Sequence, residues 1–210
     1  MDDIFRHLGV VTRTSTRTER DGKTLRLVIA SRDYETGIDD LWDAVTSAER
    51  IPRWFMPIEG DLRLGGRYQL IGNAGGEITR CEPPRRLSVT WEFAGNVTWV
   101  DVVLEAEGEA RTRLTMEHAG EVPPEFWDQY GPGATGVGWD LGLLGLGLHI
   151  EGGKSVPPEE SAGWMASAEG KSYVRGSSDA WREAAVKDGE DAAWANDAAE
   201  RTRKFYTGES

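Results

Sequence analysis

The chain has 210 residues, a length that suits one domain with an extension or two small domains. It carries 24 Lys and Arg against 36 Asp and Glu, a formal net charge of -12, so neither nucleic acid nor an anionic membrane is expected as a partner. Cys81 is the single cysteine and cannot form an internal disulfide, and the first residues lack an apolar secretion signal, which predicts a cytoplasmic protein. Nine tryptophans predict a folded chain with an aromatic interior.

The first predicted elements are a strand and two helical segments. Residues 23–31 are apolar and rich in β-branched side chains, as in a strand. Thr36-Gly37-Ile38-Asp39 has the spacing of a helix start, in which the threonine side chain bonds a free N–H group of the first turn. Apolar residues at helical spacing then predict an amphipathic helix over 37–48, and a short helical turn is expected at 52–55.

A run of strands follows with short, glycine-marked connections, which predicts antiparallel neighbours. Within 86–93 apolar residues alternate with polar ones, so one face of this strand is expected to be buried and the other to face water. The predicted strands are Asp61–Leu64 and Arg67–Ile71, joined by a turn at Gly65-Gly66, then Glu77–Cys81, Arg86–Phe93, Val97–Ala106 and Ala110–His118.

After Pro123-Pro124 the pattern returns to helix and continues to Ile150. In this stretch one apolar stripe has glycines beside it, so the helix can lie close to whatever it covers. The stripe consists of Val137, Leu141, Leu144 and Leu148. Strand, helix, a run of antiparallel strands and a long helix together predict an α+β domain, in which a curved sheet wraps around a helix.

The rest of the chain has no strand pattern. Residues 151–158 have the Gly, Ser and Pro content of a linker, and 159–206 predict two or three helices with breaks at Ser178-Asp179 and Asp188-Gly189. We therefore expect a domain over 1–155 and an α-helical extension over 156–210. Two apolar stripes of the extension must be buried, either on its own domain or in a homodimer. They consist of Trp181, Ala184 and Ala185, and of Trp194, Ala198 and Phe205.

Three segments and the long helix resemble a known superfamily. AERIPRWFMP (48–57), GDLRLGGRYQL (60–70) and GGEITRCEPPRRLSVTWEF (75–93) are similar to the SRPBCC superfamily, also called START-like or Bet v 1-like. Within it they resemble the branch named for the activator of the heat-shock chaperone ATPase. The resemblance covers about residues 23–150. It implies a helix-grip fold with a cavity between the sheet and the long helix for hydrophobic molecules, and it does not imply one reaction.

The aromatic and aliphatic side chains of the predicted strands agree with such a cavity, because a glycine-lined helix supplies little bulk to fill it. A closely packed core without a cavity is the alternative. The candidate ligand-binding residues are Trp54, Phe55, Tyr68, Leu70, Val89, Trp91, Phe93, Val102, Met116, His118, Trp139, Asp140 and Leu143.

Two of these residues are also candidates for acid–base catalysis. His118 follows Leu114 and Met116 in strand alternation, so its side chain is expected at the rim of the cavity, where it is either a general base or only a polar strand end. Asp140 would gain a raised pKa if it faced the cavity, but a solvent-facing position on the helix is the simpler interpretation. Arg67 is expected to be a surface arginine or to reach a polar ligand group. No cofactor is expected, because the glycine motif at 131–136 does not follow a strand, and no His/Cys spacing indicates a metal site.

Three functional hypotheses remain open. The first is a binding protein for a small hydrophobic ligand. The second is an enzyme similar to polyketide cyclases or hydrolases, although no catalytic constellation is evident in the sequence. The third is an ATPase activator similar to co-chaperones, which rests on the resemblance alone.

Overall fold

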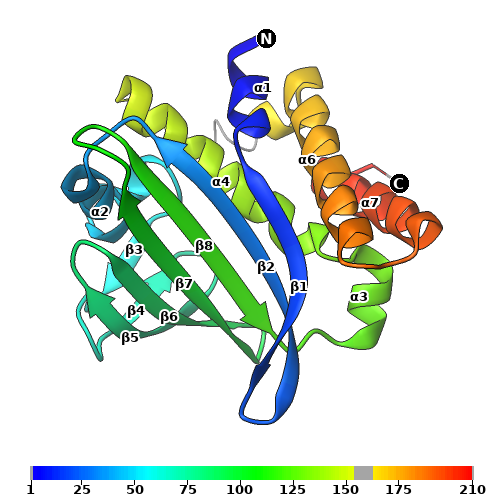
Figure 1. The fold of residues 1–210 in the computed structure, drawn as a ribbon, viewed down its shortest axis with the longest axis horizontal. Coiled ribbons are helices and arrows are strands. Elements are labelled where there is room, and N and C mark those ends of the chain that lie inside the picture. Colours follow the sequence, from blue (N-terminus) through cyan, green and yellow to red (C-terminus); the bar gives the residue numbers. More distant parts are fainter. Residues whose placement is uncertain (1, 154–162, 210) are drawn as a thin grey trace. The chain divides into compact units, whose positions relative to one another are not determined.

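The computed structural model describes residues 2–153 and 163–209, and its elements follow the predicted α+β order (Figure 1). Within these residues eight strands form one sheet in the order β1-β2-β8-β7-β6-β5-β4-β3. The strands are β1 (Thr12–Arg20), β2 (Lys23–Tyr34), β3 (Ile58–Gly60), β4 (Arg67–Leu70), β5 (Gly75–Glu82), β6 (Arg86–Phe93), β7 (Asn96–Ala106) and β8 (Thr112–Gly120). The helices are α1 (Asp2–Gly9), α2 (Ile38–Thr46), α3 (Pro124–Tyr130), α4 (Gly133–Gly152), α6 (Ala168–Lys187) and α7 (Ala192–Thr207), with a short 3-10 helix, η1, at Ile51–Arg53.

From β3 to β8 each strand pairs antiparallel with the next one, which confirms the predicted pairing. The predicted strand over 61–64 is wrong, because the strand in this region, β3, ends at Gly60. Residues 61–66 instead turn back on themselves: the N–H of Arg63 donates to the carbonyl of Asp61, and the N–H of Gly66 donates to that of Arg63. Backbone groups that bond within a turn cannot extend a strand ladder.

The sequence analysis missed α1 and β1. Strand β1 has the polar sequence TRTSTRTER and therefore lacks the apolar run that predicted the other strands. Asp21 and Gly22 follow it, and both have positive φ angles, of 50° and 76°. Because Asp-Gly is a strong hairpin signal, this dipeptide could have revealed the strand before it.

Helix α2 lies within the predicted range 37–48, but its start differs from the prediction. Thr36 does not cap the helix: Gly37 is the N-cap residue and makes no side-chain hydrogen bond. The hydroxyl of Thr36 donates instead to Asp40 Oδ2 at 2.8 Å. The helix therefore starts one residue later than the Thr-x-x-acid spacing predicts, because Gly37 and not Thr36 takes the N-cap position.

The predicted long helix consists of α3 and α4, with Gly131 between them at a φ of 57°. The predicted linker begins too early, because Glu151 and Gly152 still belong to α4. Residues 154–158 of this linker lie outside the described residues.

The C-terminal extension contains the predicted helices, α6 and α7. Asp188 ends α6 as expected, whereas Ser178-Asp179 lies inside it, so that predicted break is wrong. Trp181 is fully buried, as predicted for the first apolar stripe of the extension. The burial predicted for Phe205 is wrong: it is 62% exposed, because it lies near the end of α7, with its ring beside those of Tyr130 and Tyr206.

The chain divides into two compact units. Unit 1 comprises Met1–Ala30, Glu121–Leu144 and Glu159–Ser210, and unit 2 comprises Ser31–Gly120 and Gly145–Pro158. The boundary between them falls inside β2 and inside α4. Within unit 1, α6 packs against β1, α1 and α7, and α3 packs against α7. A homodimer through the extension stays a prediction.

Candidate functional site

Unit 2 contains one apolar face of the sheet. Residues that lie opposite each other in the register share a face, and here Val89 lies opposite Val100 and Leu87 opposite Val102. On the neighbouring strand, Ile78 lies opposite Val89. We call the following side chains the apolar face: Tyr68, Leu70, Ile78, Leu87, Val89, Trp91, Thr98, Val100, Val102, Leu104, Leu114, Met116 and His118.

Burial changes across the apolar face. Its side chains on β7 and β8 include Val100, Leu104, Leu114 and Met116, each at most 3% exposed. On β6, in contrast, every residue from Arg86 to Glu92 is only partly buried, so the expected fully buried side of this strand is absent. The apolar face is therefore closed at these four side chains and partly accessible along β6, and Thr98, Val102 and His118 on the neighbouring strands are also only partly buried.

Most of the other sequence-predicted ligand residues of unit 2 gather beside this accessible part. Tyr68 and Leu70 form a buried cluster with Ile78, against which Phe55, Val89 and Trp91 pack. Val102 and Met116 lie opposite each other on β7 and β8. Phe93 does not join them: it is 54% exposed at the hairpin between β6 and β7.

The Trp54-Phe55 segment is held in place from two sides. Trp54 Nε1 donates to the carbonyl of Ala44 in α2 at 2.9 Å, and its ring stacks on Phe55 with centroids 5.4 Å apart. Gly145 of α4 lies directly against the Trp54 carbonyl oxygen, where a Cβ atom would come closer than 3.0 Å. The glycine-lined helix therefore approaches this backbone directly, as the sequence predicted for its small residues.

His118 is the histidine of the apolar face. Its Nε2 lies 2.7 Å from Thr98 Oγ1, and its ring centroid lies 5.9 Å from that of Trp91. The register places it opposite Val100, which confirms the predicted alternation with Leu114 and Met116. Burial lowers the pKa of His118 from 6.5 to about 4, so the imidazole is neutral at pH 7.

We expect the stability of the protein to fall between pH 6.5 and pH 4 because of His118. The pKa of His118 is lower in the folded protein than in the unfolded chain, so the unfolded state binds more protons in this window. Acid therefore stabilises the unfolded state relative to the folded one. As the pH falls, the wild type should therefore lose more of its unfolding free energy than His118→Phe does. Urea unfolding at pH 7 and 4.5, with the NMR titration of His118, measures this effect, and a titration midpoint near 6.5 would contradict it.

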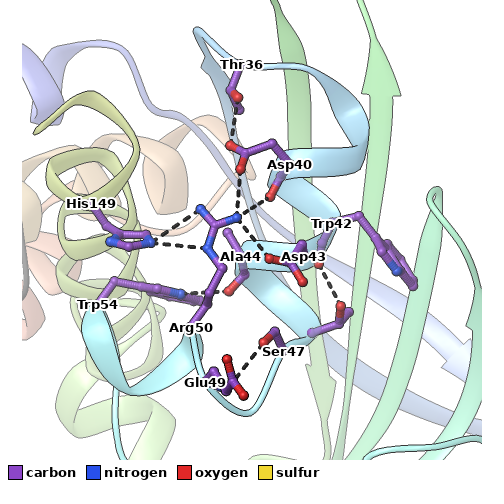
Figure 2. A network of polar contacts seen from close by, with 11 residues as sticks. Thr36, Asp40, Trp42, Asp43, Ala44, Ser47, Glu49, Arg50, Trp54 and His149 are labelled. Atoms are coloured by element: carbon purple, nitrogen blue, oxygen red, sulfur yellow. Dashed lines mark hydrogen bonds and ion pairs between the residues drawn. The ribbon is translucent and has the colours of Figure 1, made fainter. Parts of the chain in front are cut away.

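A second polar group in unit 2 centres on Arg50, whose guanidinium lies between two aspartates and a histidine (Figure 2). Arg50 Nη1 donates to Asp40 Oδ1 at 2.7 Å and to Asp43 Oδ2 at 3.1 Å. Its Nε and Nη2 lie 3.4 and 3.3 Å from Nε2 of His149, which is 6% exposed. Because a guanidinium can only donate, this nitrogen of His149 accepts.

The Arg50 network joins α2, η1 and the end of α4 (Figure 2). Burial alone would raise the pKa of Asp40, but the hydrogen bonds from Thr36 and Arg50 hold it below its usual value. The single positive charge of Arg50 therefore lies between the carboxylates of Asp40 and Asp43, while His149 only accepts a hydrogen bond. Sequence reasoning missed it, because Arg50 and His149 are separated by 99 positions and neither forms a motif.

In unit 1, Asp140 is fully buried, so the interpretation of this residue as solvent-facing is wrong. Arg13 Nε donates to both carboxylate oxygens, at 3.1 and 2.9 Å, and Trp181 Nε1 donates to Oδ2 at 3.1 Å. The hydroxyl of Ser177 donates to Oδ2 as well, and Tyr173 Oη donates to the Asp140 backbone carbonyl at 3.0 Å. Burial raises the pKa of Asp140, while the three side-chain donors favour its ionised form.

The remaining predicted residues belong to unit 1 or lie at the surface. Trp139 and Leu143 belong, like Asp140, to the part of α4 in unit 1, where Leu143 is buried and Trp139 partly buried. Arg67 is exposed and donates to Glu92 Oε2 at 2.6 Å, which agrees with a surface arginine.

Comparison with protein families identifies the chain. A family model described as "Activator of Hsp90 ATPase homolog 1-like protein" matches residues 35–146, more than half of the sequence. The chain belongs to this family. The match confirms the resemblance to the SRPBCC superfamily drawn from the sequence segments. A search of curated proteins finds no match.

Solved structures of the same fold include two of CalU16 from Micromonospora echinospora. The crystal structure has a TM-score of 0.65 and 33% identity over 86% of this chain and 99% of CalU16. The solution structure has a TM-score of 0.62 and 29% identity over 95% and 94% of the two chains. DynU16, described as a protein in the dynemicin biosynthetic locus, has a TM-score of 0.53 and 25% identity over 62% of this chain and 49% of its own. These similarities confirm the helix-grip fold.

The family match also separates Asp140 from its partners. Asp140 lies inside the matched range 35–146, whereas Arg13, Ser177 and Trp181 all lie outside it. The segments that flank the family domain in sequence therefore supply both the positive charge and the neutral hydrogen-bond donors of a carboxylate within it.

Two absences concern the described residues only. Residues 2–153 and 163–209 contain no cluster of three or more His, Cys, Asp or Glu side chains arranged for a metal ion. In the same part of the chain no helix combines the length and the apolar character that crossing a membrane requires.

Proposed function

We propose that the protein binds a small hydrophobic ligand on the apolar face of unit 2, along β6. The observation that carries this proposal is the partial exposure of Leu87, Val89 and Trp91, large apolar side chains that lie beside the buried part of the same face. Exposed apolar surface that gathers on one side of an element marks a binding site more often than scattered exposed residues do. The tight cluster of Tyr68, Leu70 and Ile78 beside them gives the site a rigid base.

The comparisons support a ligand-binding role at a coarser level. The family fold is one of the ligand-binding SRPBCC type. DynU16 is described as a protein of a biosynthetic locus, a context in which small organic molecules are made and handled. A small molecule is therefore the partner that these similarities favour for the present chain.

A neutral fluorescent probe tests the proposal directly. N-phenyl-1-naphthylamine should bind the purified protein saturably, with an increase in its emission. Trp91→Leu should weaken binding about tenfold, since it removes aromatic contact area worth about 1.4 kcal/mol. Trp99→Leu is the matched control, because Trp99 lies opposite Thr90 on the other side of the sheet and is also partly buried.

Two outcomes would overturn this proposal. The first is the absence of saturable binding for this probe and for a panel of neutral aromatic compounds, with the fold verified by circular dichroism. The second is an equal loss of affinity in the Trp91 and Trp99 variants, which would place the bound probe elsewhere.

A second candidate function follows from the family match alone. The matching family is described by activation of the Hsp90 ATPase, so stimulation of such an ATPase is a proposal for this chain. The steady-state ATP hydrolysis of a purified Hsp90 chaperone, with and without an excess of the protein, tests it. An unchanged hydrolysis rate would count against this function and would leave the ligand-binding proposal untouched.

A further inference from the structure

Thr98 and His118 form a polar pair within the apolar face. They lie on the neighbouring strands β7 and β8, and their polar atoms approach to 2.7 Å. Thr98 lies opposite Trp91 in the register, so the pair is next to the aromatic ring on the accessible strand. All other side chains of this face on β6, β7 and β8 that are named above are apolar, which makes this pair its local source of hydrogen bonds.

The hydroxyl of Thr98 has one hydrogen-bonding position left. A hydroxyl carries one proton and two lone pairs. Depending on the imidazole tautomer, its one proton is donated either to the carbonyl of Trp91, at 3.2 Å, or to His118 Nε2, at 2.7 Å. In both arrangements a lone pair of Thr98 remains, and a ligand group that meets it must be a donor.

The orientation of this hydroxyl is set by packing. Thr98 Cγ2 fills the space beside Gly120, where an added Cβ atom would overlap it. With the methyl group held there and the hydroxyl oxygen within hydrogen-bond distance of both the Trp91 carbonyl and His118 Nε2, the rotation of the threonine side chain is restricted. A fixed acceptor selects among ligands better than a freely rotating one, since less entropy is lost on binding.

The electrostatics around Thr98 and His118 favour a neutral ligand. His118 is uncharged at pH 7, because burial lowers its pKa to about 4. No Asp, Glu, Lys or Arg side chain occurs among the residues of the apolar face, all of which are described. An ionised ligand group would lose its hydration here without finding an opposite charge.

We propose that this part of the apolar face binds a planar aromatic compound with a hydroxyl group, whose O–H donates to Thr98 Oγ1 while its ring packs beside Trp91. The inference rests on the proposed ligand-binding function and narrows it to one chemical class. It assigns Thr98 as the residue that selects the hydroxyl, and Trp91 as the residue that selects the ring.

Three probes of one ring size separate the contributions: naphthalene, 2-naphthol and 2-methoxynaphthalene, measured at pH 7 by the quenching of tryptophan fluorescence. In the wild type, 2-naphthol should bind about three- to tenfold more tightly than naphthalene, the range of one net hydrogen bond. 2-Methoxynaphthalene should bind no more tightly than naphthalene, because its oxygen carries no proton to donate.

Variants of Thr98 assign the preference to one atom. Thr98→Val should abolish the preference for 2-naphthol and leave naphthalene binding within about twofold. Thr98→Ser, which retains the hydroxyl, should keep the preference. Thr115→Val is the matched control, since Thr115 lies opposite Val103 on the other side of the sheet and bonds Ser31 there.

The outcomes distinguish the two proposals. The inference about the hydroxyl fails if naphthalene binds but 2-naphthol binds no more tightly. It also fails if 2-methoxynaphthalene binds as tightly as 2-naphthol. In both cases the proposal of an apolar binding site is unaffected. A preference that survives in Thr98→Val would also overturn it. If none of the three compounds binds, the proposed function fails and this inference fails with it.

Discussion

Arg13→Met should lower the free energy of unfolding by about 3–5 kcal/mol, the range measured when one partner of a buried ion pair is removed. The side chains of Arg13 and Asp140 are 7% and 0% exposed, and Arg13 Nε lies 2.9 Å from Asp140 Oδ2. Without the guanidinium, the carboxylate would stay buried with only the neutral donors Ser177 and Trp181. Urea unfolding of the protein, followed by tryptophan fluorescence, measures the change.

Arg17→Met is the control for Arg13→Met. Arg17 lies on the same strand and pairs with Glu190 at 3.0 Å, but its side chain is 48% exposed. Because exposed ion pairs contribute about 0–1 kcal/mol, this variant should change the stability little. Equal effects of the two substitutions would show that the Arg13–Asp140 pair is not a buried one.

The double variant Arg13→Met/Asp140→Asn separates charge from packing. An asparagine oxygen still accepts from Ser177 and Trp181 but brings no buried charge. We therefore expect the double variant to be more stable than Arg13→Met alone. If the two are equally unstable, the loss comes from the missing arginine side chain and not from the unpaired carboxylate.

The parts of the fold that follow from alternation between neighbouring residues could be predicted from the sequence. The alternation in Arg86–Phe93 defined β6 and, with Leu114 and Met116, placed His118 on the apolar face. Such predictions succeed because successive strand residues point to opposite faces, whatever packs on them. The same reasoning failed for the burial of β6, since alternation shows which residues share a face but not what covers that face.

The hydrogen-bond networks around Asp140 and Arg50 could not be predicted in this way. Asp140 receives hydrogen bonds from Arg13 and Ser177, which are 127 and 37 positions away. A helical aspartate next to Trp139 has the same local sequence whether it meets solvent or an arginine from a distant strand. Its burial depends on the packing of α6 against β1, which local patterns do not contain. The Arg50–His149 contact is hidden from sequence for the same reason.

Gly145→Ala should destabilise unit 2 by about 2–3 kcal/mol, at the upper end of what overpacking costs. Alanine is intrinsically the better helix residue by about 1 kcal/mol, so helix propensity alone predicts the opposite sign. The atom in the way of the new methyl group is the backbone oxygen of Trp54, which cannot turn aside as a side chain does. Trp54 is in turn anchored to the Ala44 carbonyl, so the segment has little room to move.

Gly138→Ala provides the control within the same helix. Its nearest neighbour is the hydroxyl oxygen of Tyr206, at 2.9 Å from the added Cβ, a side-chain atom that needs to move by only a few tenths of an ångström and can do so while it keeps its hydrogen bond to the Ala134 carbonyl. We expect its cost to be about 1 kcal/mol or less after the gain in helix propensity. Because Trp54 stacks on Phe55, which packs against the Tyr68 cluster, Gly145→Ala should also weaken probe binding, whereas Gly138→Ala should not. Equal stability of the two variants would mean that the close approach of Gly145 to Trp54 does not constrain the fold, and unaltered probe affinity in Gly145→Ala would separate that contact from the apolar face.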